Sequence, residues 1–130
     1  MDNQKPSGQD KRKFKRVEAS FSVVYTVEAP YELRMRIGRD VEGIANDLSQ
    51  GGLSLMTNHQ IPAGALLQIK FRLLNNSAIS EADRSRKFQL QGEARHNSFS
   101  KENGYRVGIR FLNVSEADRD FVANYVRSIR

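Results

Sequence analysis

Apolar residues alternate with polar ones along several stretches of this chain, and that alternation most limits what the chain can fold into. Successive side chains of a β-strand point to opposite faces, so a period of two indicates a strand with one buried face. Residues 21–27, 66–74 and 105–111 carry large apolar side chains at every odd position. The chain is therefore expected to be mainly β.

Four further stretches are expected to be extended, namely residues 31–37, 41–48, 53–56 and 87–97. Turn residues separate several of them, for example Gly38-Arg39-Asp40, which suits a hairpin, and Gly51-Gly52. The polar residues 75–86 are expected to form a loop. Six or seven short strands are predicted in this way.

The period of the apolar residues changes at Ser115, where Ser115-Glu116-Ala117-Asp118 resembles a capping box with Asp in place of Glu or Gln. Apolar residues then recur at helical spacing up to Ile129. A helix over residues 115–129 is predicted. Because so small a barrel needs a cover for its core, we expect a six-stranded antiparallel β-barrel over residues 18–113 with this helix packed on it.

The length and composition fit one domain. The 130 residues contain no cysteine, which excludes disulfides and thiolate metal sites. No apolar run approaches the roughly 20 residues that span a bilayer. Residues 1–10 are polar, lack the apolar core of a signal peptide, and are expected to be a disordered leader. A cytoplasmic protein is expected.

The net charge of +6 favours anionic partners, such as nucleic acid, an acidic membrane surface or a phosphorylated small molecule. Residues 11–16 hold five of the 21 Lys and Arg residues, so the charge is concentrated. A second cluster contains Arg34, Arg36 and Arg39. It is interpreted as a solvated hairpin tip, with a partner surface as the alternative.

No catalytic constellation is recognisable. The two histidines, His59 and His96, stand in unrelated contexts and are expected to be surface or loop residues. Nucleophile elbows, metalloprotease motifs and phosphate-binding glycine loops are missing from the sequence, and the acidic residues lack metal-ligand spacing. The chain is therefore expected to be no enzyme and to hold no metal or cofactor.

The basic arm contains Arg12-x-x-x-Arg16, with Lys11 before it and two lysines within it. A guanidinium is a planar fork of donors that can engage a phosphate, or the O6/N7 edge of guanine, through two hydrogen bonds. A flexible arm with such groups could fold over a ligand. A solvated basic tail remains the alternative.

The segment Asp47-x-Ser49-x-x-Gly52 follows a predicted strand and ends in Gly51-Gly52, so it is a tight turn. A carboxylate can accept from the N1 and N2 edge of guanine, a hydroxyl can bond a phosphate or base, and glycines allow close backbone approach. The alternative is a turn in which Asp47 and Ser49 bond only their own backbone.

The two motifs together resemble the PilZ domain family, which carries RxxxR in an N-terminal arm and D/NxSxxG about thirty residues later. Here Arg16 precedes Asp47 by 31 positions. The stretch 104–111, Gly-Tyr-Arg-Val-Gly-Ile-Arg-Phe, is similar to the last strand of that family. The resemblance extends over roughly residues 10–129 and implies a single PilZ domain at 11–130, with the arm at 11–17.

The resemblance implies a barrel that binds cyclic di-GMP. Arg12 and Arg16 would grip guanine and phosphate, and Asp47 and Ser49 would read a guanine edge. The remaining implied ligand contacts are Gly51 and Gly52, which allow close approach, Lys11, which influences whether one or two ligand molecules bind, and Arg95. Arg95 lies where some members carry an extra Trp or Arg contact, and is otherwise a surface charge.

The favoured interpretation is therefore a non-enzymatic second-messenger receptor. Ligand binding would order the arm against the barrel and present a new surface to a downstream protein partner. The alternative is a basic barrel that binds nucleic acid by stacking bases on exposed aromatic residues. Most aromatic residues alternate into predicted core faces, with Phe14 and Phe99 as possible exceptions, so nucleic acid is the less favoured partner.

Overall fold

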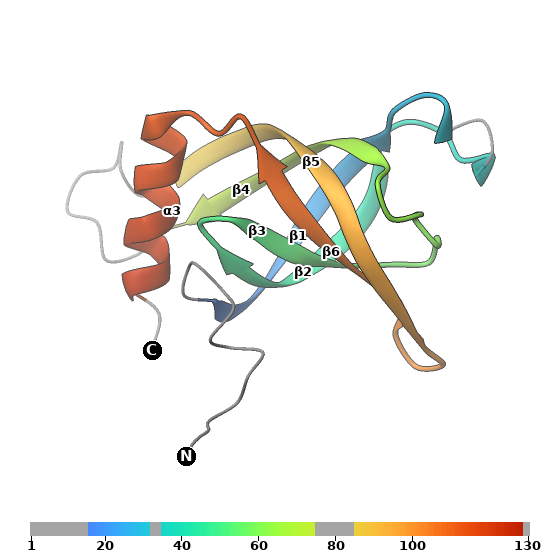
Figure 1. The fold of residues 1–130 in the computed structure, drawn as a ribbon. Coiled ribbons are helices and arrows are strands. Elements are labelled where there is room, and N and C mark those ends of the chain that lie inside the picture. The colour runs from blue at the N-terminus through green and yellow to red at the C-terminus, as the bar shows by residue number, and fades with distance from the viewer. Residues whose placement is uncertain (1–15, 32–34, 75–84, 129–130) are drawn as a thin grey trace, which may run out of the picture.

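The computed structural model describes residues 16–31, 35–74 and 85–128, and these form a barrel with a helix at one end (Figure 1). The elements in chain order are β1 Val17–Val27, β2 Val41–Ser49, β3 Gly52–Thr57, β4 Leu66–Leu74, β5 Ser85–Ser100, β6 Gly104–Leu112 and the helix α3 Glu116–Ser128. The predicted leader and most of the predicted arm, residues 1–15, lie outside the described residues.

Each strand is antiparallel to both of its neighbours. The order around the barrel is β1-β2-β3-β6-β5-β4, and pairing of β1 with β4 closes it. The predicted six-stranded antiparallel barrel with a C-terminal helix is confirmed.

The alternating apolar residues form the core. The odd-numbered apolar residues of β4 and β6 point inward, and most are almost completely buried. Phe71 of β4 stacks on Phe88 of β5 with ring centroids 4.9 Å apart. The Tyr25 hydroxyl lies 2.6 Å from the Thr57 hydroxyl within the core, so this buried polar pair is satisfied.

The helix α3 covers the core at one end of the barrel, as predicted (Figure 1). The Ser115 hydroxyl accepts a hydrogen bond from the Asp118 amide at 3.1 Å, which caps the helix. Val122 and Val126 are buried, and the ring of Phe121 meets Phe88 edge-on with centroids 5.8 Å apart.

One predicted strand is wrong. Residues 31–37 were expected to be extended, but Tyr31 and Met35 are helical and Arg36 has a φ of 55°. The reason is topological: β2 and β4 occupy both edges of β1, so no edge is open to a seventh strand. Arg36 and Arg39 are exposed, and Arg34 lies outside the described residues.

The fifth strand is longer than predicted, because it runs over Ser85–Ser100 rather than residues 87–97. Its outer end forms a hairpin with β6 in which Ser100 pairs with Gly104. The predicted loop before it, apart from its last two residues, lies outside the described residues.

Candidate functional site

A β-bulge in β2 places Asp47 on the outer surface of the barrel. Ala45, fully buried, pairs with Leu55, whereas Asp47 pairs with Ser54, so the register shifts between them. In an unbroken strand Asp47 would share the inner face of Ala45, because residues two apart point the same way. The bulge therefore keeps a carboxylate out of the apolar core.

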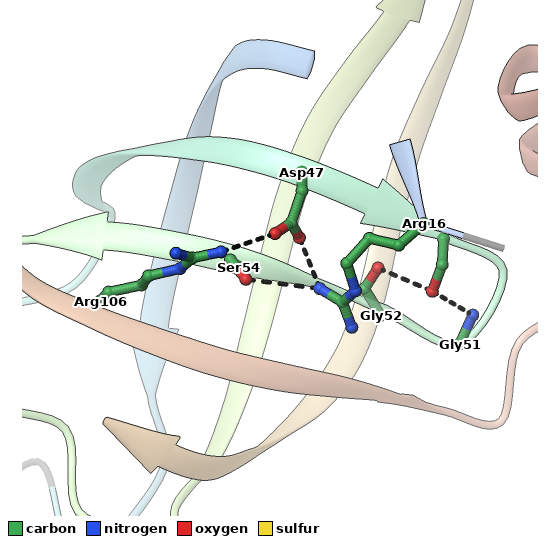
Figure 2. Close-up of polar contacts among 7 residues, drawn as sticks. Arg16, Asp47, Gly51, Gly52, Ser54 and Arg106 are labelled. Carbon is green, nitrogen blue, oxygen red and sulfur yellow. Dashed lines mark hydrogen bonds and ion pairs between the residues drawn. The ribbon is translucent and has the colours of Figure 1, made fainter. Parts of the chain in front are cut away.

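The carboxylate of Asp47 lies between two guanidiniums (Figure 2). Arg16 Nη1 donates to Asp47 Oδ1 at 2.5 Å and also reaches Ser54 Oγ at 3.3 Å. Arg106 Nη2 donates to Asp47 Oδ2 at 2.9 Å. The side chain of Asp47 is only 8% exposed, although it faces outward. Hydrogen bonds that pair opposite charges in such a site are stronger than neutral ones.

Arg16 still has an unused donor. Its Nε is buried and has no hydrogen-bond partner among the described residues. Buried donors in folded proteins nearly always have a partner. An acceptor brought to this point by a ligand would satisfy it.

Ser49 stabilises its own turn. Its hydroxyl accepts from the Gly51 amide at 3.1 Å and lies 3.5 Å from the Gly52 carbonyl oxygen. The Gly51 carbonyl accepts from the Phe111 amide at 2.9 Å, which fixes the turn to β6. The alternative in which the turn residues bond only their own backbone therefore holds for Ser49, but not for Asp47. A ligand contact by Ser49 or Gly51 stays a prediction.

Gly52 is required by the barrel itself. A Cβ at this position would lie 2.0 Å from the carbonyl oxygen of Ile109 on β6, far inside van der Waals contact. Gly52 pairs with Arg110 at this point of the β3–β6 ladder. The close approach that the glycine allows is thus an approach between two strands, and its role towards a ligand stays a prediction.

A cavity of about 680 Å³ adjoins the turn. Four guanidiniums line it, those of Arg16, Arg95, Arg110 and Arg119. Arg95 and Arg110 each pair with Glu93 at 3.2 Å, whereas Arg119 has no ion pair with any described residue. So many guanidiniums around one hollow favour an anion.

A second cavity, of about 400 Å³, lies over the Asp47 contacts. It shares Arg16, His96 and Gly108 with the first cavity and adds Asp47, Ser54 and Arg106. The two hollows therefore meet at Arg16 and His96, with the carboxylate in one and most of the guanidiniums in the other.

The structure brings Arg16, the turn 47–52 and Arg95 together around these cavities. Lys11 and Arg12 lie outside the described residues, so their part in the site stays a prediction.

Sequence reasoning missed Arg106, Arg110 and Arg119. Arg106 and Arg110 occupy even, outward positions of the alternating strand, which was a usable signal. Nothing local marks Arg119, because the fold alone brings α3 to the turn.

Neither metal chemistry nor a membrane span finds support in the described part of the chain. Among residues 16–31, 35–74 and 85–128, no group of three His, Cys, Asp or Glu side chains could hold a metal ion. Within the same ranges, no helix has both the length and the apolar character that crossing a membrane demands.

Fold and site together define a small helix-capped barrel with an arginine-rich surface beside a glycine turn. The sequence model of the PilZ domain matches residues 10–128, and the chain belongs to the PilZ domain family. A search of the curated proteins found no match.

Solved structures share the fold at low identity. The inhibitor of motility from Bacillus subtilis is 13% identical, with a TM-score of 0.68 over 90% of this chain and 50% of that one. YcgR from Escherichia coli in complex with c-di-GMP is 20% identical, with a TM-score of 0.64 over 91% of this chain and 45% of that one. The chain thus spans about half the length of these two proteins. The PilZ domain of YcgR with c-di-GMP is 19% identical, with a TM-score of 0.57 over 92% and 91% of the two chains.

Proposed function

We propose that this protein is a receptor for cyclic di-GMP, acts in the cytoplasm and catalyses no reaction. The observation that carries the proposal is the contact of Arg16 with Asp47, because it joins the arm motif to the turn motif across 31 positions. Family membership and similar structures that contain c-di-GMP support the choice of ligand.

The chemistry of the site fits a ligand with two phosphates and two guanines. Asp47 can accept from the N1 and N2 edge of a guanine, while Arg16, with Arg12 from the arm, can grip phosphate or the O6/N7 edge. The four guanidiniums of the larger cavity suit the phosphates. Ser49, Gly51, Gly52, Lys11 and Arg95 complete the proposed contact set.

Binding requires an exchange of partners at Asp47. Both carboxylate oxygens already accept from guanidiniums, Oδ1 from Arg16 and Oδ2 from Arg106. Each oxygen keeps a second lone pair, but the carboxylate is only 8% exposed beneath the two guanidiniums, so a guanine edge reaches it only when one of them moves aside. We propose that Arg16 moves to the ligand, that the arm follows it, and that the altered surface binds a downstream protein.

Titration calorimetry with cyclic di-GMP tests the proposal. We expect micromolar binding by the wild type, and a loss of about 10-fold in Arg16→Ala, since the ligand replaces the contact that Arg16 gives up at Asp47 and adds one to its unpaired Nε, and a hydrogen bond to a charged group contributes about 1.5 kcal/mol or more. Arg127→Ala is the matched control, because the side chain of Arg127 has one polar partner among the described residues, Asn124 of its own helix. An absence of heat with the wild type, or full affinity in Arg16→Ala, would contradict the proposal.

The proposed movement of the arm can be followed by trypsin, which cleaves after Lys and Arg. Residues 11–16 contain five such sites, so cleavage there reports directly on the arm. We expect saturating cyclic di-GMP to slow cleavage of the arm in the wild type but not in Arg16→Ala. Equal cleavage rates with and without ligand would rule out ordering of the arm.

Nucleic-acid binding remains the alternative. Phe99 is 62% exposed and packs against Tyr105 with ring centroids 5.0 Å apart, at the β5–β6 hairpin. It is the only aromatic among the large, exposed apolar side chains of the described residues, which leaves little stacking surface. A salt-sensitive gel shift with generic oligonucleotides, abolished in Phe99→Ala, would favour this alternative over the receptor.

A further inference from the structure

One row of paired residues crosses the outer surface of four strands. Asp47 of β2 pairs with Ser54 of β3, and Ser54 pairs with Gly108 of β6. Gly108 in turn pairs with His96 of β5. His96 is therefore the far end of the row that begins with the carboxylate of the proposed site.

A second bulge brings His96 into this row. Ala94 is buried and pairs with Ile109, and the register shifts between Ala94 and His96. In an unbroken strand His96 would point into the core with Ala94. The extra residue, Arg95, turns His96 outward, by the same device that turns Asp47 outward in β2.

The imidazole of His96 packs directly on Gly108. A Cβ on Gly108 would lie 2.5 Å from Cε1 and 2.8 Å from Nδ1 of His96, so the ring lies directly against the backbone of β6. The three heavy atoms nearest to that hypothetical Cβ are all ring atoms of His96. Only a glycine at this position leaves room for the ring.

The imidazole is exposed and has no polar partner among the described residues. The side chain is exposed and lines both cavities beside Arg16. Among the described residues, none forms a hydrogen bond or ion pair with its ring. A planar ring held against the backbone and open to a cavity is a platform on which a flat base can stack.

We propose that His96 is a base-stacking residue: a purine ring of the ligand stacks on its imidazole, and Gly108 leaves the room that the imidazole needs. This inference rests on the proposed function and adds a specificity-determining contact to it. A purine that presents its edge to Asp47 would extend along the row, over Ser54, towards His96. Stacking of a base on an aromatic side chain strengthens binding by about 5-fold to 100-fold.

Four variants, titrated with cyclic di-GMP by calorimetry, test the inference. His96→Ala is expected to weaken binding by about tenfold. His96→Phe, which keeps a flat ring without nitrogen atoms, is expected to stay within about threefold of the wild type, because stacking needs no hydrogen bond. His59→Ala is the control, since His59 lines neither cavity of the site.

The fourth variant, Gly108→Ala, displaces the ring without removing it. We expect it to weaken binding in the wild-type background and to change nothing further in His96→Ala, because the two positions then act through one group. The atoms nearest to its added methyl belong to the imidazole of an exposed side chain, which can move aside, so the barrel should fold, which thermal unfolding verifies.

The possible results distinguish a failure of the stacking role from a failure of the receptor function. Wild-type affinity in His96→Ala, independent effects at the two positions, or equal losses in His96→Phe and His96→Ala would each overturn the stacking role while leaving the receptor function standing. A wild-type protein without heat of binding would overturn the proposed function, and the stacking role with it.

Discussion

Replacing Asp47 with Asn removes the negative charge that lies between the guanidiniums of Arg16 and Arg106. The amide keeps the shape of the carboxylate, but its NH2 group would face a guanidinium, donor against donor. One of the two contacts is then lost, and the other becomes a weaker, neutral acceptor. The perturbation therefore measures the electrostatic part of the site with little change in packing.

The magnitude follows from the exposure of the partners. The contact with Arg16 is largely buried, because the Arg16 and Asp47 side chains are 27% and 8% exposed. A hydrogen bond to a charged group in such a place contributes about 1.5–3 kcal/mol. Arg106 is 52% exposed, so solvent reduces its share to about 0.5–1 kcal/mol. Because one contact is lost and the other only weakened, we expect Asp47→Asn to lower the free energy of unfolding by about 1–3 kcal/mol.

Urea unfolding of both proteins measures this difference. Asp40→Asn is the matched control, because Asp40 is exposed, pairs with Lys70 only at 3.7 Å, and has a φ of 55° that asparagine tolerates. Asp40→Asn should lower the free energy of unfolding by less than about 0.5 kcal/mol. The loss in Asp47→Asn should persist at about 0.5 M salt, since buried pairs are poorly screened. Equal unfolding midpoints for the two variants would refute the reasoning.

Three further predictions concern other parts of the barrel. Gly52→Ala should destabilise the fold by about 3 kcal/mol or more, because its methyl would lie 2.0 Å from a carbonyl oxygen of β6; a normal thermal transition would contradict this. Burial raises the pKa of Tyr25 above its ordinary value of 10.0, so its contribution to the free energy of unfolding should be complete below pH 10 and fall above it, where the unfolded chain ionises. In Tyr25→Phe, unfolding curves measured at alkaline pH should therefore show a smaller loss of the free energy of unfolding with rising pH. An equal loss in the variant and the wild type would contradict the burial effect. Arg119→Ala should weaken cyclic di-GMP binding severalfold and lower its salt dependence, while Arg127→Ala on the same helix should do neither; calorimetry at two salt concentrations decides.

The barrel could be predicted because alternation is a local signal. The odd-numbered apolar residues of β4 and β6 fix which face of each strand is buried without knowledge of the rest of the chain. The same alternation led to the wrong prediction of a strand at residues 31–37. A stretch of that kind becomes a strand only if an edge is free, and closure of the barrel by β1 and β4 removed the edge.

The candidate site could be predicted only in part, because its residues come from distant strands. Arg16 and the turn 47–52 were found through motif spacing. The position of His96 depends on a bulge that no apolar residue marks, since the inward-facing residue after Ala94 is the polar Asn97. By contrast Ala45 and Leu48, both buried and three apart, do mark the bulge in β2. Polar contacts between distant outward-facing residues leave no such trace.

The contact between Arg16 and Asp47 has a consequence for the ligand concentration at which the proposed receptor responds. If the contact contributes about 2 kcal/mol, conformations in which Asp47 is free of Arg16 make up only about one in thirty molecules. The apparent affinity falls by that factor, unless the released guanidinium gains an equivalent partner on the ligand. A phosphate gives Arg16 such a charged partner, and one for its unpaired Nε as well, whereas the O6/N7 edge of a guanine offers only neutral acceptors. A neutral guanine derivative would therefore recover only part of the cost, whereas a phosphate-bearing one recovers it in full, so the same contact that shields Asp47 favours a charged ligand.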